Sequence, residues 1–431
     1  MHNESRFRSV ASHAISRTAT SATLLAIVSA LMLVLGLPAQ AQTFTVLHNF
    51  TGGVDGANPS AGLTLDAAGN LYGTASNGGN RDRCASGCGT VFRMAHRGSG
   101  WVFAPLYDFT GGSGGTYDGT TPRARVIKGA NGTLYGTTTG GAGGAGTVFN
   151  LRPPPTFPHT PFDRWNITIL HAFQGGSDGE FPQGGDLVFD EAGSLYGTTG
   201  YGGSGNEGTA YKLTYSHGEW TEKVIYAFQH GGSLPFSGVI FDPAGNLYGT
   251  TYGGGIGWGV VYELLPSGSG WIENDLYIFQ GWNDGNYPTG GLIFDLSGNL
   301  YGCTTIGGSR GGGTVFKLSP SGGNWTLTVL YSFEPGGGGP ASSLVMDAAG
   351  NLFGTTSGDG THSYGNVFKL VPSGSSWIYT DLHDFTGGLD GWNPIAGVTL
   401  DANGNLYGTA YYGGTGSSCP LGCGVVWEIT P

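Results

Sequence analysis

The sequence predicts an all-β protein that consists of one seven-bladed β-propeller with four-stranded blades. The first supporting observation is a repeated motif, which in residues 242–251 reads Asp-Pro-Ala-Gly-Asn-Leu-Tyr-Gly-Thr-Thr. It is typical of a tight turn followed by a short strand, because Gly supplies the positive φ that closes the turn. The motif recurs at intervals of roughly 50–60 residues, which suits a propeller blade and is too long for a solenoid repeat. Its aromatic residue occurs seven times, as Tyr72, Tyr135, Tyr196, Tyr248, Tyr301, Phe353 and Tyr407.

The second observation is that each repeat contains four strand signals. In the repeat around Tyr248 they cover residues 238–241, 246–251, 259–264 and 271–279. Apolar residues occur on both faces of these strands. This pattern is expected when each sheet lies between two neighbouring sheets, as it does in a propeller.

The third observation concerns the two ends of the chain. The seventh repeat stops after its third strand, Gly424–Ile429, whereas Thr43–Phe50 matches the end of a fourth strand such as Leu276–Phe279. We therefore expect the N-terminal strand to complete the last blade. Such closure removes the free strand edges that make an open β array prone to aggregation.

Residues 1–41 have the pattern of a signal peptide. Several arginines precede an apolar run over 24–37, and Ala39-Gln40-Ala41 provides a cleavage site. The apolar run is shorter than the ~20 residues that a bilayer span requires. We therefore predict a secreted, extracellular protein without a membrane span after signal cleavage, in which residues 42–431 form the propeller.

Composition limits the choice of partners. Charged residues make up 11% of the chain and the net charge is −12, so the sequence offers no basic patch for a phosphate backbone. Aromatic residues make up 12% and supply many core anchors despite 85 glycines. We expect a monomer with no nucleic-acid partner and no cofactor.

Several motifs resemble a known repeat family. They are Asp-Gly-x-x-Pro, Gly-Leu-x-x-Asp-x-x-Gly-Asn-Leu-Tyr-Gly-Thr-Thr, Gly-Thr-Val-Phe-Lys-Leu and Pro-Ser-Gly-x-x-Trp. Together they look like the gloeo/verruco (GloVer) tandem repeat of exported bacterial proteins, and the resemblance spans essentially all of 43–431. It implies a secreted or surface-anchored repeat protein without a particular activity, because propellers host many unrelated functions.

One face of the predicted propeller varies much more than the other. If the first strand of each blade is innermost, this face carries the connectors between blades and the loops between second and third strands, and we call it the loop face. Functional residues concentrate in such variable loops. The alternative for its aromatic residues is that they wedge between blades and cover glycine-rich loops. The predicted ligand-binding residues of the loop face are Trp258, Trp282, Trp392, Tyr287, Asp284 and Asp390, because exposed rings can stack on sugars while carboxylates add hydrogen bonds.

Acidic residues recur at one position of the connectors. A ring of carboxylates could bind Ca²⁺ or act on a sugar. The simpler interpretation is that Asp before Gly accepts backbone hydrogen bonds in a turn. Repetition favours the turn, because a catalytic site needs unlike groups placed asymmetrically. The residues concerned are Asp55, Asp118, Asp178, Asp284 and Asp390.

Histidines give no catalytic or metal signal. His48, His171 and His383 occupy a position that holds Tyr in other repeats, and no two histidines have metal-ligand spacing. The sequence also contains no nucleophile elbow and no phosphate loop. We therefore predict no catalytic residue and no metal site. The acids that an enzyme would have to use are Glu180, Glu207 and Asp359.

Five cysteines in an exported protein predict two disulfides and one free thiol. Cys84 and Cys88 lie in one loop of the first repeat, and Cys419 and Cys423 lie in the equivalent loop of the last. Local bridges are expected first, a cross-link between the two loops is the alternative, and a four-thiolate metal site is a more distant one. Cys303 replaces a Thr of the repeated motif and should be a buried, unreactive thiol.

Two functions are compatible with these observations. The first is a non-catalytic module that binds an extracellular polysaccharide or protein through the loop face. The second is a carbohydrate-active enzyme, either a glycoside hydrolase or a lyase, with its site at the mouth of the central channel. Near-identical repeats without a pair of unlike catalytic groups favour the binding module.

Overall fold

The structure is a computed structural model that describes residues 42–98, 100–112, 117–141, 144–154, 165–229, 231–268 and 270–431. The predicted signal peptide, residues 1–41, lies outside the described residues and stays a prediction. Residues Phe44–Thr430 form one compact unit. Within the described part of the chain, no helix is both long and apolar enough to cross a bilayer.

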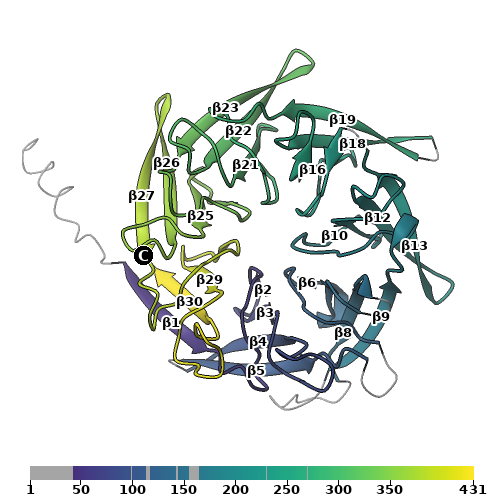
Figure 1. The fold of residues 1–431 in the computed structure, drawn as a ribbon, viewed down its shortest axis with the longest axis vertical. Coiled ribbons are helices and arrows are strands. Elements are labelled where there is room, and N and C mark those ends of the chain that lie inside the picture. The colour runs from purple at the N-terminus through teal and green to yellow at the C-terminus, as the bar shows by residue number, and fades with distance from the viewer. Residues whose placement is uncertain are drawn as a thin grey trace, which may run out of the picture. The chain divides into compact units, whose positions relative to one another are not determined.

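Seven four-stranded antiparallel sheets form a ring, which confirms the predicted seven-bladed propeller (Figure 1). Blade one contains β2 (Thr64–Leu65), β3 (Leu71–Ala75), β4 (Thr90–Arg97) and β5 (Gly100–Asp108). Blade two contains β6 (Ile127–Lys128), β7 (Leu134–Thr138), β8 (Thr147–Arg152) and β9 (Asn166–Ala172). Blade three contains β10 (Val188–Phe189), β11 (Leu195–Thr199), β12 (Thr209–Ser216) and β13 (Glu219–Ala227). Blade four contains β15 (Ile240–Phe241), β16 (Leu247–Thr251), β18 (Val260–Ser267) and β19 (Gly270–Ile278).

The remaining blades repeat this arrangement. Blade five contains β20 (Ile293–Phe294), β21 (Leu300–Thr304), β22 (Thr314–Ser321) and β23 (Asn324–Ser332). Blade six contains β24 (Val345–Met346), β25 (Leu352–Thr356), β26 (Asn366–Ser373) and β27 (Ser376–Asp384). Blade seven contains β28 (Thr399–Leu400), β29 (Leu406–Ala410), β30 (Val425–Thr430) and β1 (Thr43–Asn49). A separate pair, β14 (Gly232–Ser233) and β17 (Gly253–Gly254), and two short 3₁₀ turns, η2 (Ala130–Gly132) and η4 (Gly176–Asp178), lie in loops.

The repeated Asp closes the turn between the first two strands of each blade. In blade four, the Asp242 carboxylate accepts hydrogen bonds from the backbone N–H groups of Ala244 and Asn246 at 2.8 and 2.9 Å. Gly245 has a φ of +88°, and the hydroxyl of Tyr248 donates to the same carboxylate at 3.2 Å. The motif is therefore a self-contained turn, and its regular spacing along the chain has a structural cause.

The repeated Gly of each second strand is required by a close approach. In blade four, a Cβ atom on Gly249 would lie 2.3 Å from the hydroxyl of Tyr262, which is fully buried on the third strand. An aromatic ring occupies this third-strand position in every blade, so the second strand must stay without a side chain there. The rings are Phe92, Phe149, Tyr211, Tyr262, Phe316, Phe368 and Trp427.

The hydrophobic core lies between blades. One cluster joins Val261 and Phe279 of blade four to Leu292 and Phe316 of blade five, and the other blade boundaries have similar clusters. Both faces of each sheet are thus covered, as the sequence predicts. Each buried Phe or Leu side chain contributes roughly 1.5–3 kcal/mol of transfer free energy.

The N-terminal strand closes the ring. The last blade has the order β1-β30-β29-β28, so its outermost strand comes from the start of the propeller and the other three from its end (Figure 1). The backbone N–H of Phe50 donates to the carbonyl of Gly424 at 3.1 Å. The predicted closure is therefore confirmed.

Candidate functional site

Connectors and second-to-third loops lie together on the loop face. Antiparallel bridges join them, for example between Glu180 and Tyr201 and between Trp392 and Tyr412. In blade four the same pairing is extended into β14 and β17. The loops in which the sequence places its candidate ligand-binding residues are therefore neighbours.

The connector acids make hydrogen bonds within their own connectors. The Asp284 carboxylate accepts hydrogen bonds from the Tyr277 hydroxyl and the Gln280 backbone N–H, both at 2.8 Å. Asp390 accepts a bond from the backbone N–H of Thr386 at 2.9 Å and lies 3.2 Å from Nε2 of His383. These bonds are the ones expected for a turn, and they give the Tyr or His at the end of each fourth strand a fixed partner.

The hydrogen bonds also stabilise the ionised form of such an acid. Burial alone would raise the pKa of Asp55, but hydrogen bonds from His48 and Thr51 lower the pKa below its usual value. A carboxylate held in this way stays charged and oriented toward its own connector.

Eight aromatic residues of the loop face form two closely spaced groups, which we call aromatic tracks. Within each track, neighbouring ring centroids are 4.5–5.8 Å apart. All eight rings are partly exposed, so each track presents aromatic surface to solvent. The blade four track is Phe236, Tyr252, Tyr287 and Trp258, and the blade seven track is Tyr411, Tyr412, Trp392 and Tyr364.

The structure thus separates the predicted binding residues into two places. Trp258 and Tyr287 lie in the blade four track, and Asp284 and Trp282 belong to the same connector as Tyr287. Trp392 belongs to the blade seven track. The Trp282 side chain is 80% exposed, and no ring contact joins it to either track among the described residues.

Trp258 has a packing contact that the sequence did not reveal. Its indole lies over Gly281, where an added Cβ atom would come within 3.2 Å of the ring. The equivalent glycines Gly52 and Gly111 are covered in the same way by the disulfides of the preceding blades. Trp258 therefore fills a position that a disulfide fills elsewhere.

Both predicted local disulfides are present. Cys84 bonds to Cys88 and Cys419 bonds to Cys423, while Cys303 is free and buried. Burial raises the pKa of the Cys303 thiol far above its usual value, which makes it unreactive. Structural disulfides are typical of proteins outside the cytoplasm.

A cavity of about 500 Å³ lies where the seven connectors enter their innermost strands. All seven blades contribute to it, so it occupies the central channel, and we call it the channel cavity. Each connector has a Pro at the cavity, and the next residue lines the wall. In blade order these wall residues are Ser60, Arg123, Gln183, Phe236, Thr289, Ala341 and Ile395.

The lining of the channel cavity is unequal. At the position after the proline, blades two, three and four contribute a guanidinium, an amide and an aromatic ring in succession, whereas the other four blades have small or aliphatic side chains there. Arg125 pairs with Asp186, with 3.0 Å between Nε and Oδ2. Arg123 is exposed and has no ion pair within the described residues. The sequence carries this signal, which appears when the connectors are aligned on their prolines.

The two tracks begin at the channel cavity. Phe236 and Tyr411 line its wall and are the first rings of the blade four and blade seven tracks. A ligand in the cavity can therefore contact aromatic surface that continues outward along the loop face. This continuity links the predicted Tyr287 and Trp392 to a cavity that the sequence did not reveal.

Two half-buried acids on fourth strands were not expected from the sequence. Glu222 and Glu273 occupy a position that is apolar or aromatic in the other blades. Burial raises the pKa of Glu273 to about 7, although the Tyr226 hydroxyl donates a hydrogen bond to its carboxylate at 2.8 Å. Burial, together with the charge of Asp178, raises the pKa of Glu222 to about 7 as well.

The three acids suggested for an enzyme lie in different places. Glu207 lies near Glu273, Asp359 interacts with Asp384 near the end of β27, and Glu180 belongs to the blade three connector. The pKa of Asp359 is raised by burial and by neighbouring acids. None of the three is among the residues that line the channel cavity.

The fold and the repeated motif define a β-propeller repeat protein whose blades differ mainly at the loop face. The sequence matches the model of the Gloeobacter/Verrucomicrobia repeat over residues 33–188 and 185–427. The chain belongs to this family, and the resemblance drawn from its motifs is confirmed. No curated protein matches the sequence significantly.

Several solved structures are similar to this chain at low sequence identity. The extracellular domain of a hybrid two-component system from B. thetaiotaomicron has 13% identity and a TM-score of 0.53, over 89% of this chain and 39% of that chain. A gluconolactonase from Xanthomonas campestris has 15% identity and a TM-score of 0.40, over 73% of this chain and 87% of that chain. A protein described as a putative glucose dehydrogenase from Thermus thermophilus has 13% identity and a TM-score of 0.40, over 90% of this chain and 99% of that chain. This chain spans less than half of the first of these proteins, and the likeness to that domain concerns the fold alone.

Proposed function

We propose that this protein is a secreted, non-catalytic module that binds an extracellular polysaccharide at the channel cavity and along the aromatic tracks. The observation that carries the proposal is the unequal lining of the cavity. Arg123, Gln183 and Phe236 place three unlike groups on adjacent blades of a repeated scaffold. Unlike groups in one concave site are what recognition of an asymmetric ligand requires.

Each group has a role toward a sugar. The Phe236 ring offers an apolar plane for the apolar face of a pyranose, and Tyr411 offers a second one across the cavity. The Gln183 amide can donate and accept hydrogen bonds with hydroxyl groups. The Arg123 guanidinium matches a carboxylate in two-pronged geometry, so we expect a preference for acidic sugars.

The aromatic tracks extend the proposed site to several sugar units. Rings with limited rotamer freedom provide contact area at a low entropic cost, as in other recognition surfaces. Tyr287 and Trp392 would contact units that lie outside the cavity. Trp282, whose indole is exposed, would contribute a further ring from the same connector as Tyr287.

Glycoside hydrolysis at the channel cavity has weaker support. Hydrolysis commonly uses two carboxyl groups on opposite sides of the bond that breaks. Among the residues that line the cavity, Asp186 is the single carboxylate, and Arg125 holds it in an ion pair. We therefore prefer binding without catalysis.

The test is a binding screen of the full secreted chain against matched neutral and uronate-containing polysaccharides. Arg123→Ser introduces the residue that blade one has at this position, so the backbone already accommodates it. Loss of a charge-assisted hydrogen bond of about 1.5–3 kcal/mol should weaken binding of the acidic glycan by at least about tenfold. Thr289→Ala is the control, because Thr289 occupies the equivalent position in blade five, away from Arg123, Gln183 and Phe236, and it should leave affinity unchanged.

Two results would oppose the proposal. If Arg123→Ser and the unmodified chain had equal affinity for every glycan that binds, Arg123 would not take part in glycan recognition. Release of sugar fragments from a polysaccharide, abolished by a substitution in the cavity, would instead establish the enzymatic alternative.

A further inference from the structure

Neighbouring fourth strands make the same stacking contact at three blade boundaries, where the Tyr or His near the end of one fourth strand is covered by an aromatic ring of the next blade. At the same position, opposite a Leu of the third strand, blades two and five have Ile167 and Leu327. Phe103 stacks on His48 with centroids 3.9 Å apart, and Tyr379 stacks on Tyr331 at 4.5 Å. Phe44 stacks on His383 at 3.6 Å. The position therefore favours an apolar or aromatic cover.

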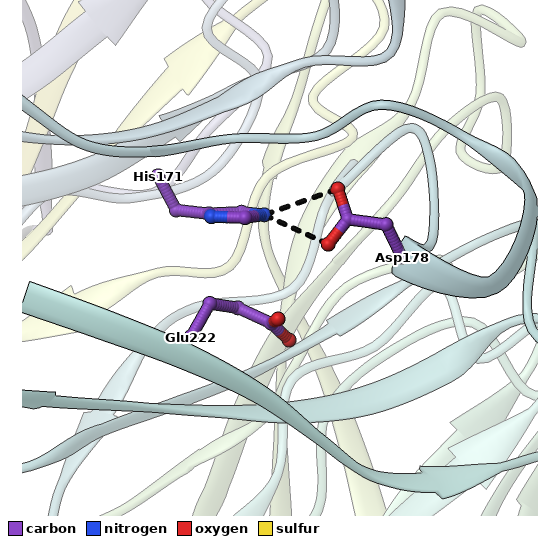
Figure 2. Close-up of side chains that lie close together, drawn as sticks. All are labelled: His171, Asp178 and Glu222. Carbon is purple, nitrogen blue, oxygen red and sulfur yellow. Dashed lines mark hydrogen bonds and ion pairs between the residues drawn. The ribbon is translucent and has the colours of Figure 1, made fainter.

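The boundary between blades two and three departs from this pattern. There the covering residue is Glu222 of β13, opposite Leu213, and the covered residue is His171 of β9. Nε2 of His171 lies 3.0 and 3.2 Å from the two oxygens of Asp178 in the connector. Figure 2 shows the Glu222 carboxylate directed toward the same place from the other strand, and one donor atom from each residue lies within 4.8 Å of the others.

The surroundings of the Glu222 carboxylate offer no hydrogen-bond partner that would account for its position. Its Oε1 atom is buried and has no hydrogen-bond partner among the described residues. At the next boundary the Oε2 atom of the equivalent Glu273 accepts a hydrogen bond from the Tyr226 hydroxyl, although its Oε1 atom also has no partner among the described residues. His171 gives Glu222 no such bond, because its Nε2 is directed to Asp178. A half-buried carboxylate next to a second carboxylate is unfavourable unless a positive charge compensates both.

We propose that His171, Asp178 and Glu222 form a binding site for one divalent transition-metal ion. One imidazole nitrogen and two carboxylate oxygens suit an ion such as Zn²⁺, which takes nitrogen and oxygen ligands at about 2.0–2.2 Å. Tetrahedral coordination at such lengths brings donor atoms to roughly 3.3 Å from one another. Small side-chain rotations are enough to reach this spacing from the observed one. The three protein ligands leave a fourth position for water or a ligand group.

The site would act as a clamp between blades. It joins β9, the connector of blade three and β13, so the ion would hold two adjacent outer strands in one geometry. The buried ring of Phe173 packs edge-on against His171 at 4.8 Å and fixes the imidazole orientation. The inference is independent of the proposed polysaccharide binding, because none of the three ligands lines the channel cavity.

Zinc titration of the untagged full chain, stripped with a chelator and followed by calorimetry, tests the proposal. The unmodified chain should bind one Zn²⁺ per molecule and unfold at a higher temperature when zinc is present. Substituting residues in the outer shell of a metal site commonly weakens binding about 10–100-fold, so losing a ligand should cost at least as much. Glu222→Leu, which introduces the residue that blade five has at this position, should therefore weaken zinc binding at least tenfold.

Glu273→Leu is the matched control, because it makes the same change one blade further on, beside Tyr226 instead of a histidine. It should leave zinc stoichiometry and affinity unchanged. Absence of zinc binding by the folded unmodified chain would overturn the proposal, as would equal binding by Glu222→Leu. The proposal would also be overturned if Glu273→Leu lost as much zinc affinity as Glu222→Leu. Circular dichroism of each variant without zinc establishes whether it is folded. If Glu222→Leu does not fold, His171→Phe, which keeps an aromatic ring at the blade boundary, provides a second variant that lacks one ligand.

Discussion

Phe50, directly after β1, provides a direct test of ring closure. Its side chain is fully buried and packs against Phe92 and Phe103 of blade one, with centroids 5.3 and 5.8 Å away. Phe50→Ala removes this apolar area and leaves a cavity, which typically costs about 3–5 kcal/mol of unfolding free energy. Because the surface exposed on unfolding hardly changes, we expect a lower denaturant midpoint with an unchanged slope.

The measurement is equilibrium unfolding in guanidinium chloride, followed by tryptophan fluorescence. Val54→Ala is the control, since this side chain is 71% exposed and its truncation should change the free energy by no more than about 0.5 kcal/mol. Phe279→Ala creates the equivalent cavity in blade four, away from the closure. If Phe50→Ala unfolded at the same denaturant concentration as Val54→Ala, the N-terminal strand would not close the ring.

Three further outcomes are expected. Burial raises the pKa of Glu273 to about 7, so the folded protein holds a proton that the unfolded chain releases at the usual lower pKa, and the unfolding free energy falls as pH rises through that window. Glu273→Gln should remove on the order of 1 kcal/mol of this loss between about pH 5 and about pH 8. Parallel pH profiles of melting temperature for the variant and the unmodified chain would contradict this expectation. Peptide mapping without reduction should find the two local disulfides and a free Cys303, whereas a peptide joining the two loops would disprove local pairing. Trp258→Ala should lower the unfolding free energy by about 2 kcal/mol because the indole covers Gly281. Trp282→Ala should change the unfolding free energy by less than about 0.5 kcal/mol. Equal losses for the two variants in urea titrations would show that Trp258 is not packed more tightly than Trp282.

The fold was predictable because its signals are local and repeated. The turn around Asp242 and the glycine opposite Tyr262 are visible within a few residues of one another, and each signal occurs once in every blade. Closure was predictable for a similar reason, because the missing fourth strand has a recognisable match at Thr43–Phe50. The number of blades follows from counting one residue per repeat.

The channel cavity was harder to predict, because its wall consists of one residue from each blade. Arg123 and Phe236 are far apart in the sequence and have no motif in common, and only the ring brings them to one cavity. The packing of Trp258 was also hard to predict. Its own loop offers no packing partner in the sequence, but a glycine of the next connector leaves room for the indole to pack.

The repeat itself supplies a way to recognise functional residues. Every blade offers an alternative residue that the same backbone tolerates, so a costly residue at one blade is not required by the fold. Arg123 replaces residues such as Ser60 and Ala341, and Glu222 replaces residues such as Leu327. A carboxylate with one oxygen buried and without a hydrogen-bond partner, as in Glu222, reduces stability relative to these alternatives, and the exposed Arg123 adds nothing to the packing of the ring. The proposed glycan and metal sites would each account for one of these exceptions, Arg123 in the channel cavity and Glu222 between two outer strands.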